Sequence, residues 1–196
     1  DRGEVEDTVQ SVVFVTEGTL TLTVRGEEHV LEPGGYAYLA AGDEWSLHNR
    51  SDAKAAFQWV RKVYERIDGY EAKTFVTREQ DIEPRPPMPD TDGAWATTRF
   101  VDPPDDLAHD MHVNIVTFQP GGSIPPFAET HIMEHGLYVL EGKAVYRLNG
   151  DWVEVQEGDF MWLRAFCPQA CYAGGPKPFR YLLYKDVNRQ VKLDRR

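Results

Sequence analysis

The residues with the clearest potential for chemistry lie in one short stretch, Glu129-Thr-His131-Ile-Met-Glu-His135. If Ala128 to Leu140 is an extended strand, its two-residue period places Glu129, His131 and His135 on one face. Two imidazoles and a carboxylate on one face are typical transition-metal ligands. A helix would also align the two histidines, but the glycine-flanked sequence after them disfavours a helix. By spacing alone, two such histidines are more often structural residues, so both interpretations stay open.

The elements that must position these residues are predicted by an internal repeat. Leu20-Thr-Leu-Thr-Val24 alternates apolar and polar residues, as a half-buried strand does, and glycine turns follow at intervals of about eight residues. The same pattern of glycines and apolar classes returns without a gap 124 residues later. The sequence therefore predicts two copies of one all-β unit, a sandwich or small barrel, with few short helices near 78–82 and 105–109. The anchors of the repeat are Glu17-Gly18, Gly26 and Gly34, matched by Glu141-Gly142, Gly150 and Gly158.

A proline-rich stretch between the two copies predicts the domain boundary. We expect a first domain at 1–82, a stiff connector at 83–93 and a second domain at 94–196. The second copy has about 35 residues before Glu129, and the first copy has four before the equivalent Val5. We therefore expect a natural chain that is longer at its N-terminus, by roughly 30 residues if the copies are alike. Any targeting signal would lie in that part.

Composition and charge exclude several classes of function. The chain has 32 acidic and 21 basic residues, a net charge of −11, which would repel the phosphate backbone of a nucleic acid. No stretch approaches the ~18 consecutive apolar residues of a membrane-spanning helix. The two cysteines, Cys167 and Cys171, are expected to be free or packed thiols. We therefore expect a protein with no nucleic-acid or membrane partner, in a reducing, cytoplasmic compartment.

The region around the histidines resembles the two signatures of the cupin superfamily. Glu129 and His131 stand at the histidine positions of the first signature, Gly-x5-His-x-His-x3/4-Glu-x6-Gly, and His135 stands at its glutamate position. The second signature, Gly-x5-Pro-x-Gly-x2-His, resembles Gly158 to Gln169, with Gln169 at the last histidine position. Its internal proline and glycine are replaced by Arg164 and Phe166.

This resemblance implies two tandem cupin barrels, that is, double-stranded β-helix or jelly-roll units. It also implies a metal bound by Glu129, His131, His135 and Gln169. Such a mixed oxygen and nitrogen set suits six-coordinate Mn²⁺ or Fe²⁺ better than tetrahedral Zn²⁺, and we predict Mn²⁺. The equivalent residues of the first copy are Val5, Asp7, Ser11 and Trp45, of which only Asp7 could bind a metal, so the first barrel is predicted to be metal-free.

The ligand order, together with the strings His131 to Gly142 and Arg180 to Arg189, resembles the (S)-ureidoglycine aminohydrolase family. The resemblance runs from about Val9 to Lys192. It implies Mn²⁺-dependent hydrolysis of (S)-ureidoglycine to (S)-ureidoglycolate and ammonia, in purine and allantoin degradation. Tyr146, Tyr181 and Lys185 would bind the substrate, and Glu129 would contact it as well.

The spacing of Tyr181 and Lys185 places them on one strand face, as wall residues of a barrel. A buried lysine near a cationic metal is costly unless an anion lies between them, and a small anionic ureide is such an anion. Glu129, Tyr181 and Lys185 are the candidate catalytic groups, and the general base is left unassigned. Two alternatives stay open, an Fe²⁺-dependent cupin dioxygenase and a non-catalytic, small-ligand-binding bicupin. The resemblance also implies a homo-oligomer.

Overall fold

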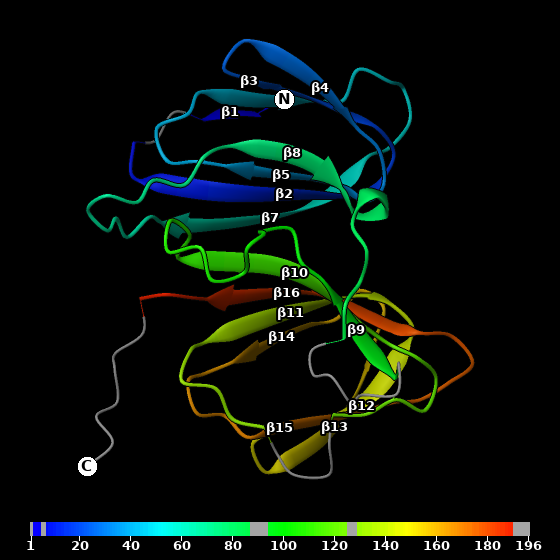
Figure 1. Ribbon diagram of the computed structural model, residues 1–196. Helices are drawn as coiled ribbons and strands as arrows, with labels where there is room; N and C mark the ends of the chain where they lie inside the picture. The colour runs from blue at the N-terminus through cyan, green and yellow to red at the C-terminus, as the bar shows by residue number, and fades with distance from the viewer. Residues whose placement is uncertain (1, 5–6, 87–93, 125–128, 190–196) are drawn as a thin grey trace. The chain divides into compact units, whose positions relative to one another are not determined.

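The computed structural model describes residues 2–4, 7–86, 94–124 and 129–189, and these are folded almost entirely as β-strands. The chain divides into two compact units (Figure 1). The first comprises Asp1–Ile82 and Leu107–His109, and the second comprises Glu83–Asp106 and Asp110–Arg196. The first unit thus ends at Ile82, where the proline-rich stretch begins, with the short segment Leu107–His109 added to it. None of the helices in the described ranges is long and apolar enough to cross a membrane.

Two antiparallel sheets of four strands build the first unit. Their strand orders are β1-β6-β3-β4 and β7-β2-β5-β8 (Figure 1). Apolar side chains from both sheets meet in one core, which includes Val13, Leu22 and Trp45. The strands are β1 (Arg2–Glu4), β2 (Val9–Glu17), β3 (Leu20–Val24), β4 (Glu27–Leu31), β5 (Gly35–Leu39), β6 (Trp45–His48), β7 (Ala56–Val63) and β8 (Phe75–Arg78).

The second unit has a larger sheet of order β14-β11-β16-β10-β9 and a smaller one of order β13-β12-β15. Its core again joins both sheets, with Leu137 on β11, Ala144 on β12 and Phe179 on β16 all buried. The strands are β9 (Trp95–Thr98), β10 (Met111–Phe118), β11 (His135–Glu141), β12 (Lys143–Leu148), β13 (Asp151–Gln156), β14 (Phe160–Leu163), β15 (Gln169–Ala173) and β16 (Phe179–Asp186).

The strand registers of the two units agree at the offset of 124 residues. Ser11 pairs with Leu39 and Arg61 in the first unit, and His135 pairs with Leu163 and Lys185 in the second. The irregularities agree as well, since β2 and β11 each shift register just before their terminal glutamate. The structure therefore confirms the predicted two-copy, all-β fold, and it makes each residue of one unit comparable with its counterpart in the other.

The glycines that end β2 and β11 are required by the backbone. Gly18 and Gly142 have φ angles of +70° and +77°, in the left-handed region that side chains disfavour. A Cβ atom on Gly142 would also lie 2.1 Å from the carbonyl oxygen of Pro178. The recurring Glu-Gly pair thus marks a point where β11 turns into β12 against the chain that enters β16.

Three local predictions need correction. The strand predicted from Ala128 to Leu140 begins only at His135. Residues 130–134 form a loop, and Glu129 makes only an isolated β-bridge. Ala128, the predicted start of the strand, lies outside the described residues. The helix expected near 78–82 is a single 3₁₀ turn, η1 (Glu79–Asp81), and the segment 105–109 forms turns rather than a helix.

The described part of the predicted connector, residues 83–86, is not a free linker. The backbone of Arg85 pairs with that of Thr97 on β9 through hydrogen bonds of 3.0 and 2.8 Å. This part of the chain therefore belongs to the second unit. Residues 87–93 of the connector lie outside the described ranges.

Candidate metal centre

The backbone positions two of the four predicted ligands directly beside each other. The amide of Glu129 donates to the carbonyl of Gln169, and the amide of Gln169 donates back to the carbonyl of Glu129, both at 2.8 Å. Gln169 is the first residue of β15, and His135 is the first residue of β11. β11 belongs to the larger sheet of the second unit and β15 to the smaller one, so each sheet brings one predicted ligand to the same place.

His131 lies in the loop of residues 130–134 and is positioned by a backbone hydrogen bond. Its carbonyl oxygen accepts a hydrogen bond of 2.7 Å from the amide of Phe166. Phe166 has a φ of +61°, and its counterpart in the first unit is Gly42, with a φ of +86°. A left-handed conformation costs a residue with a side chain roughly 1–2 kcal/mol. The second unit therefore carries backbone strain beside the predicted ligands, as functional sites often do.

The four donor side chains stand as two close pairs. His135 Nε2 lies 3.3 Å from Gln169 Oε1, and His131 Nε2 lies 3.4 Å from Glu129 Oε2. The two imidazole rings are edge to face, with centroids 5.3 Å apart. Adjacent ligands of an octahedral cation with bonds of about 2.1 Å are separated by about 3 Å, so each pair has close to the spacing of neighbouring ligands.

A stricter criterion is not met by these side chains as they stand. Among the described residues, no group of three or more His, Cys, Asp or Glu side chains could hold a metal ion without adjustment. The fourth predicted donor is an amide, and the side chains of Glu129 and His131 are 28% and 37% exposed. The chemistry of the donor set and the spacing within each pair fit a divalent cation.

The two buried donors, His135 and Gln169, lie in surroundings that favour uncharged side chains. His135 and Gln169 are each 4% exposed. Burial lowers the pKa of the His135 imidazole, hydrogen bonds to Gln169 and to the backbone of Met133 oppose this, and the charges of His131 and Lys185 lower it further. A neutral imidazole is the form that binds a metal.

Two tyrosine hydroxyls lie behind Gln169 in a hydrogen-bonded chain. The Tyr146 hydroxyl donates to Gln169 Oε1 at 2.7 Å, and the Tyr181 hydroxyl donates to that of Tyr146. Both rings are buried, and burial raises the pKa of both hydroxyls, so both stay protonated at neutral pH. The chain of donors therefore ends on the oxygen of Gln169.

A cavity of about 170 Å³ opens beside the four donor side chains. Lys185 and Arg99 are two cationic residues of its wall. Burial lowers the pKa of the Lys185 amine, the nearby charge of Arg99 lowers it further, and Glu129 opposes both. The lining residues are Trp95, Thr97, Arg99, Asn114, Val116, Ile124, Glu129, His131, Met133, His135, Leu137, Gln169, Tyr181, Leu183 and Lys185.

The cavity brings together six of the seven residues predicted for the site. Glu129, His131, His135, Gln169, Tyr181 and Lys185 all line it. Tyr146 does not, and its hydroxyl reaches the site through its hydrogen bonds with Gln169 and Tyr181. The substrate contact that the resemblance assigns to Tyr146 therefore remains a prediction, and the structure gives this hydroxyl a different neighbour.

Sequence reasoning missed the part of the wall that comes from β9, β10 and the segment after β9. Arg99 and Asn114 are the polar residues there with the most potential for chemistry. They precede the repeated region, so no counterpart in the first copy drew attention to them. The strand Met111–Phe118 contains one signal, because Asn114, like His112, is a polar residue buried in a mostly apolar strand.

The first unit lacks this chemistry at equivalent positions. The counterparts of Tyr146, Tyr181 and Gln169 are Leu22, Phe57 and Trp45. Leu22 and Trp45 are buried, and Trp45 packs edge to face on Trp59 with centroids 5.9 Å apart. The same fold therefore has an apolar interior in one unit and a polar cavity in the other.

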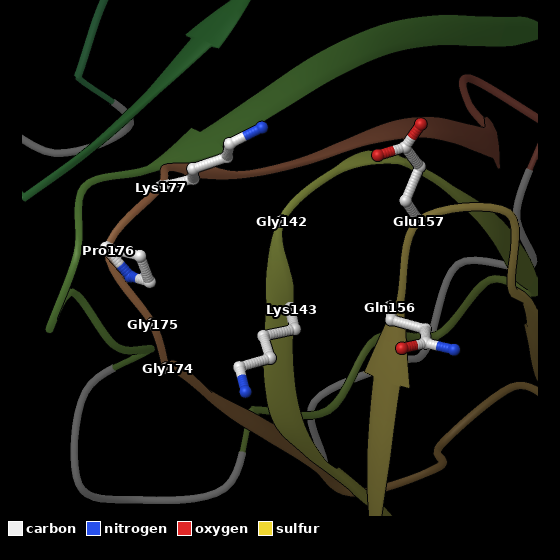
Figure 2. A pocket seen from close by; sticks show the side chains of 8 residues that line it. All are labelled: Gly142, Lys143, Gln156, Glu157, Gly174, Gly175, Pro176 and Lys177. Carbon is white, nitrogen blue, oxygen red and sulfur yellow. The ribbon is translucent and has the colours of Figure 1, made fainter.

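A larger hollow lies elsewhere on the second unit but has no convergent chemistry. It measures about 520 Å³ and is open to solvent, with Gly142, Gly174, Lys143 and Lys177 in its wall. Figure 2 shows the amines of the two lysines pointing away from each other. The residues predicted from the sequence line the smaller cavity, which is therefore the candidate site.

Comparisons with known proteins agree with this assignment of the fold. The family model described as "Cupin domain" matches residues 5–61 and 114–184. A rice protein named "Probable (S)-ureidoglycine aminohydrolase" is 36% identical over 92% of this chain and 56% of its own length. An Escherichia coli protein named (S)-ureidoglycine aminohydrolase is 28% identical over 94% of this chain and 69% of its own length.

A solved structure is more similar still. A Pseudomonas aeruginosa protein described as glyoxylate-induced is 61% identical and has a TM-score of 0.89. The match covers 97% of this chain and 71% of that one. The chain thus spans about half of the rice relative and somewhat more of the other two. The two matched segments lie one in each unit, and they show that this chain belongs to the cupin family.

Proposed function

We propose that the protein hydrolyses (S)-ureidoglycine to (S)-ureidoglycolate and ammonia, in the degradation of ureides. The observation that carries the proposal is the contrast between the two units. One fold presents Leu22, Phe57 and Trp45 in the first unit, and hydroxyl and amide groups beside two histidines and a glutamate in the second. The names of the rice and E. coli relatives supply the substrate.

In this proposal the four donor side chains bind one Mn²⁺. Glu129, His131, His135 and Gln169 would supply two oxygens and two nitrogens, which leaves an octahedral cation room for a chelating substrate. The bound cation would act as a Lewis acid that orients the substrate and neutralises developing negative charge. Because Gln169 is a neutral ligand, the site would keep net positive charge.

The two cationic residues of the wall are assigned to the carboxylate of the substrate. Both residues line the cavity, and the pKa of the Lys185 amine is lowered by burial and, in addition, by the charge of Arg99. An anion bound between them would replace this repulsion with two attractions. A small anionic ureide therefore fits this wall, and the cavity of about 170 Å³ suits a small molecule rather than a drug-sized one.

Proton movements are assigned to the residues that line the cavity. The Tyr181 hydroxyl donates its proton to Tyr146, so its oxygen is left to accept a hydrogen bond from an N–H of the ureido group. The Glu129 carboxylate, partly exposed beside the cavity, is the group that could pass a proton from water to the leaving amine. Apolar wall residues such as Trp95 and Ile124 limit access of other water.

The proposal is tested with metal-free protein, Mn²⁺ and freshly prepared (S)-ureidoglycine. We expect His135→Ala and Gln169→Ala to lose bound Mn²⁺ and ammonia release together. Lys143→Ala, at the separate hollow, should retain both. Full activity in either ligand variant would reject the assignment. Oxygen consumption without ammonia release would favour the dioxygenase alternative, and binding without turnover would favour a ligand-binding protein.

The assembly and location of the protein are also proposals. We propose a homo-oligomer, on the resemblance alone, and a cytoplasmic location, because Cys167 and Cys171 are free thiols. Light scattering of the purified protein and fractionation of the native cells test these two points.

A further inference from the structure

One buried amide in the wall of the candidate cavity has no role in the reaction as proposed above. Asn114 on β10 is only 3% exposed and lines the cavity. Within the described ranges, no hydrogen bond joins its carboxamide to another group. Its neighbours along the strand, Val113 and Ile115, are apolar and buried. Because a buried amide without a partner costs free energy, a ligand in the cavity is expected to supply the partner.

Strand pairing fixes where Asn114 lies relative to the other wall residues. Asn114 pairs with Leu183 on β16, so its diagonal neighbours on that strand are Tyr181 and Lys185. All four residues line the cavity and therefore share one face of the sheet. Diagonal neighbours of an antiparallel pair are about 7–8 Å apart. A small ligand that contacts the Tyr181 hydroxyl and the Lys185 amine therefore lies against the Asn114 carboxamide as well.

The carboxamide complements one group of the proposed substrate. The substrate carboxylate is assigned to Lys185 and Arg99, and one ureido N–H is assigned to the oxygen of Tyr181. The carbonyl oxygen and the terminal amine of the ureido group then still need partners. A carboxamide presents a donor and an acceptor side by side, whereas the hydroxyl of Thr97, also in this wall, is a single group. Asn114 is therefore the residue that matches both.

We propose that Asn114 recognises the ureido group through a pair of hydrogen bonds. Its Nδ2 donates to the ureido carbonyl oxygen, and its Oδ1 accepts from the terminal amine. This pairing rests on the proposed function, which supplies the ureido group. It makes Asn114 a specificity-determining residue, because an acid with a methyl group in place of the terminal amine would leave Oδ1 without a partner in a buried place.

The test compares two acids of nearly the same shape, N-carbamoylglycine and N-acetylglycine, by calorimetric titration of the protein with Mn²⁺ present. The first has a terminal amine where the second has a methyl group. We expect the wild-type protein to bind N-carbamoylglycine about 10–100-fold more tightly. Asn114→Leu, which has nearly the shape of asparagine, should bind the two acids about equally. Asn114→Val makes the same change with a strand-favouring residue, in case Asn114→Leu does not fold.

A matched control comes from the neighbouring strand. Thr98 on β9 is 2% exposed and does not line the cavity. Thr98→Val should therefore keep the wild-type preference between the two acids. Urea titration adds a second measurement, since Asn114→Leu removes an amide that has no partner in the described ranges and should not lower the free energy of unfolding. Lower stability together with an unchanged preference would assign Asn114 to folding and overturn the proposal.

The remaining outcomes separate this recognition from the reaction itself. If the wild-type protein does not prefer N-carbamoylglycine, or if the Asn114 variants keep the preference, the recognition is rejected even when ammonia is released from (S)-ureidoglycine. If the preference depends on Asn114 but the wild-type protein releases no ammonia, the recognition of a ureido group stands and the proposed reaction is rejected.

Discussion

Replacing Tyr146 with phenylalanine separates two roles for this residue. The resemblance implies that Tyr146 binds substrate, whereas the structure places its hydroxyl against Gln169 Oε1 at 2.7 Å, behind the cavity wall. Tyr146→Phe removes that hydrogen bond and leaves the ring in place. If the hydroxyl positions a metal ligand, the variant should bind Mn²⁺ more weakly. If it contacts substrate, the variant should bind Mn²⁺ normally and show a raised KM.

The expected size of the effect follows from the burial of the pair. Gln169 is 4% exposed and Tyr146 fully buried, so water cannot easily replace the lost donor. Loss of a partner that orients a metal ligand typically costs about 10–100-fold in metal affinity. This corresponds to about 1.4–2.7 kcal/mol. Folding stability should also fall by about 1–3 kcal/mol, because the Tyr181 hydroxyl loses its acceptor in a buried place.

The assay is calorimetric titration of metal-free protein with Mn²⁺. Tyr184→Phe is the matched control, since its hydroxyl donates to Asp186 at 2.6 Å and it does not line the cavity. A double-mutant cycle with Gln169→Ala completes the design, because Tyr146→Phe should have little further effect once its partner is gone. Unchanged Mn²⁺ affinity in Tyr146→Phe, with a raised KM, would refute the positioning role.

Three further predictions concern charge, reactivity and backbone strain. Lys185→Met should raise the KM for (S)-ureidoglycine about 10–100-fold, by loss of a charged hydrogen bond, with Mn²⁺ affinity retained; an unchanged KM would exclude contact with the carboxylate. Burial raises the pKa of the Cys171 thiol to about 12, so the reactive thiolate should be rare below that pH. Mass spectrometry after iodoacetamide treatment at pH 9 should therefore find Cys171 unmodified in folded protein and modified in denaturant, and equal labelling in both would contradict the burial. Gly142→Ala should lower the free energy of unfolding by more than Gly26→Ala in urea titrations, because both glycines have positive φ but only Gly142 faces a backbone atom, the Pro178 carbonyl oxygen. Equal losses would show that the close approach is relieved.

The fold was predictable from the sequence because its main signal is long and redundant. Matching glycines at a constant offset predict matching turns, and the turns define which strands pair. Even the bulges before Glu17 and Glu141 follow this rule. The equivalence of Ser11 with His135 and of Arg61 with Lys185 could be written down before any coordinates, and the structure places these pairs in identical registers.

Parts of the candidate site could not be predicted, for two physical reasons. The loop from 130 to 134 brings His131 to Glu129 through a hydrogen bond from Phe166, a residue in a conformation that its type disfavours. The conformational preference of a phenylalanine therefore predicts a different backbone conformation at residue 166 from the observed one. Arg99 and Asn114 come from strands and segments that pair only through tertiary contacts, so neither spacing nor the repeat links them to the histidines.

The central claim is that the second unit, and not the first, binds a divalent cation on which ammonia release depends. The most direct measurement is the rate of ammonia release from (S)-ureidoglycine by metal-free protein, before and after addition of one equivalent of Mn²⁺. The account predicts almost no ammonia release before Mn²⁺ is added and full release after it. Gln169→Ala should release almost no ammonia in either condition. Undiminished release in the presence of a chelator would contradict it.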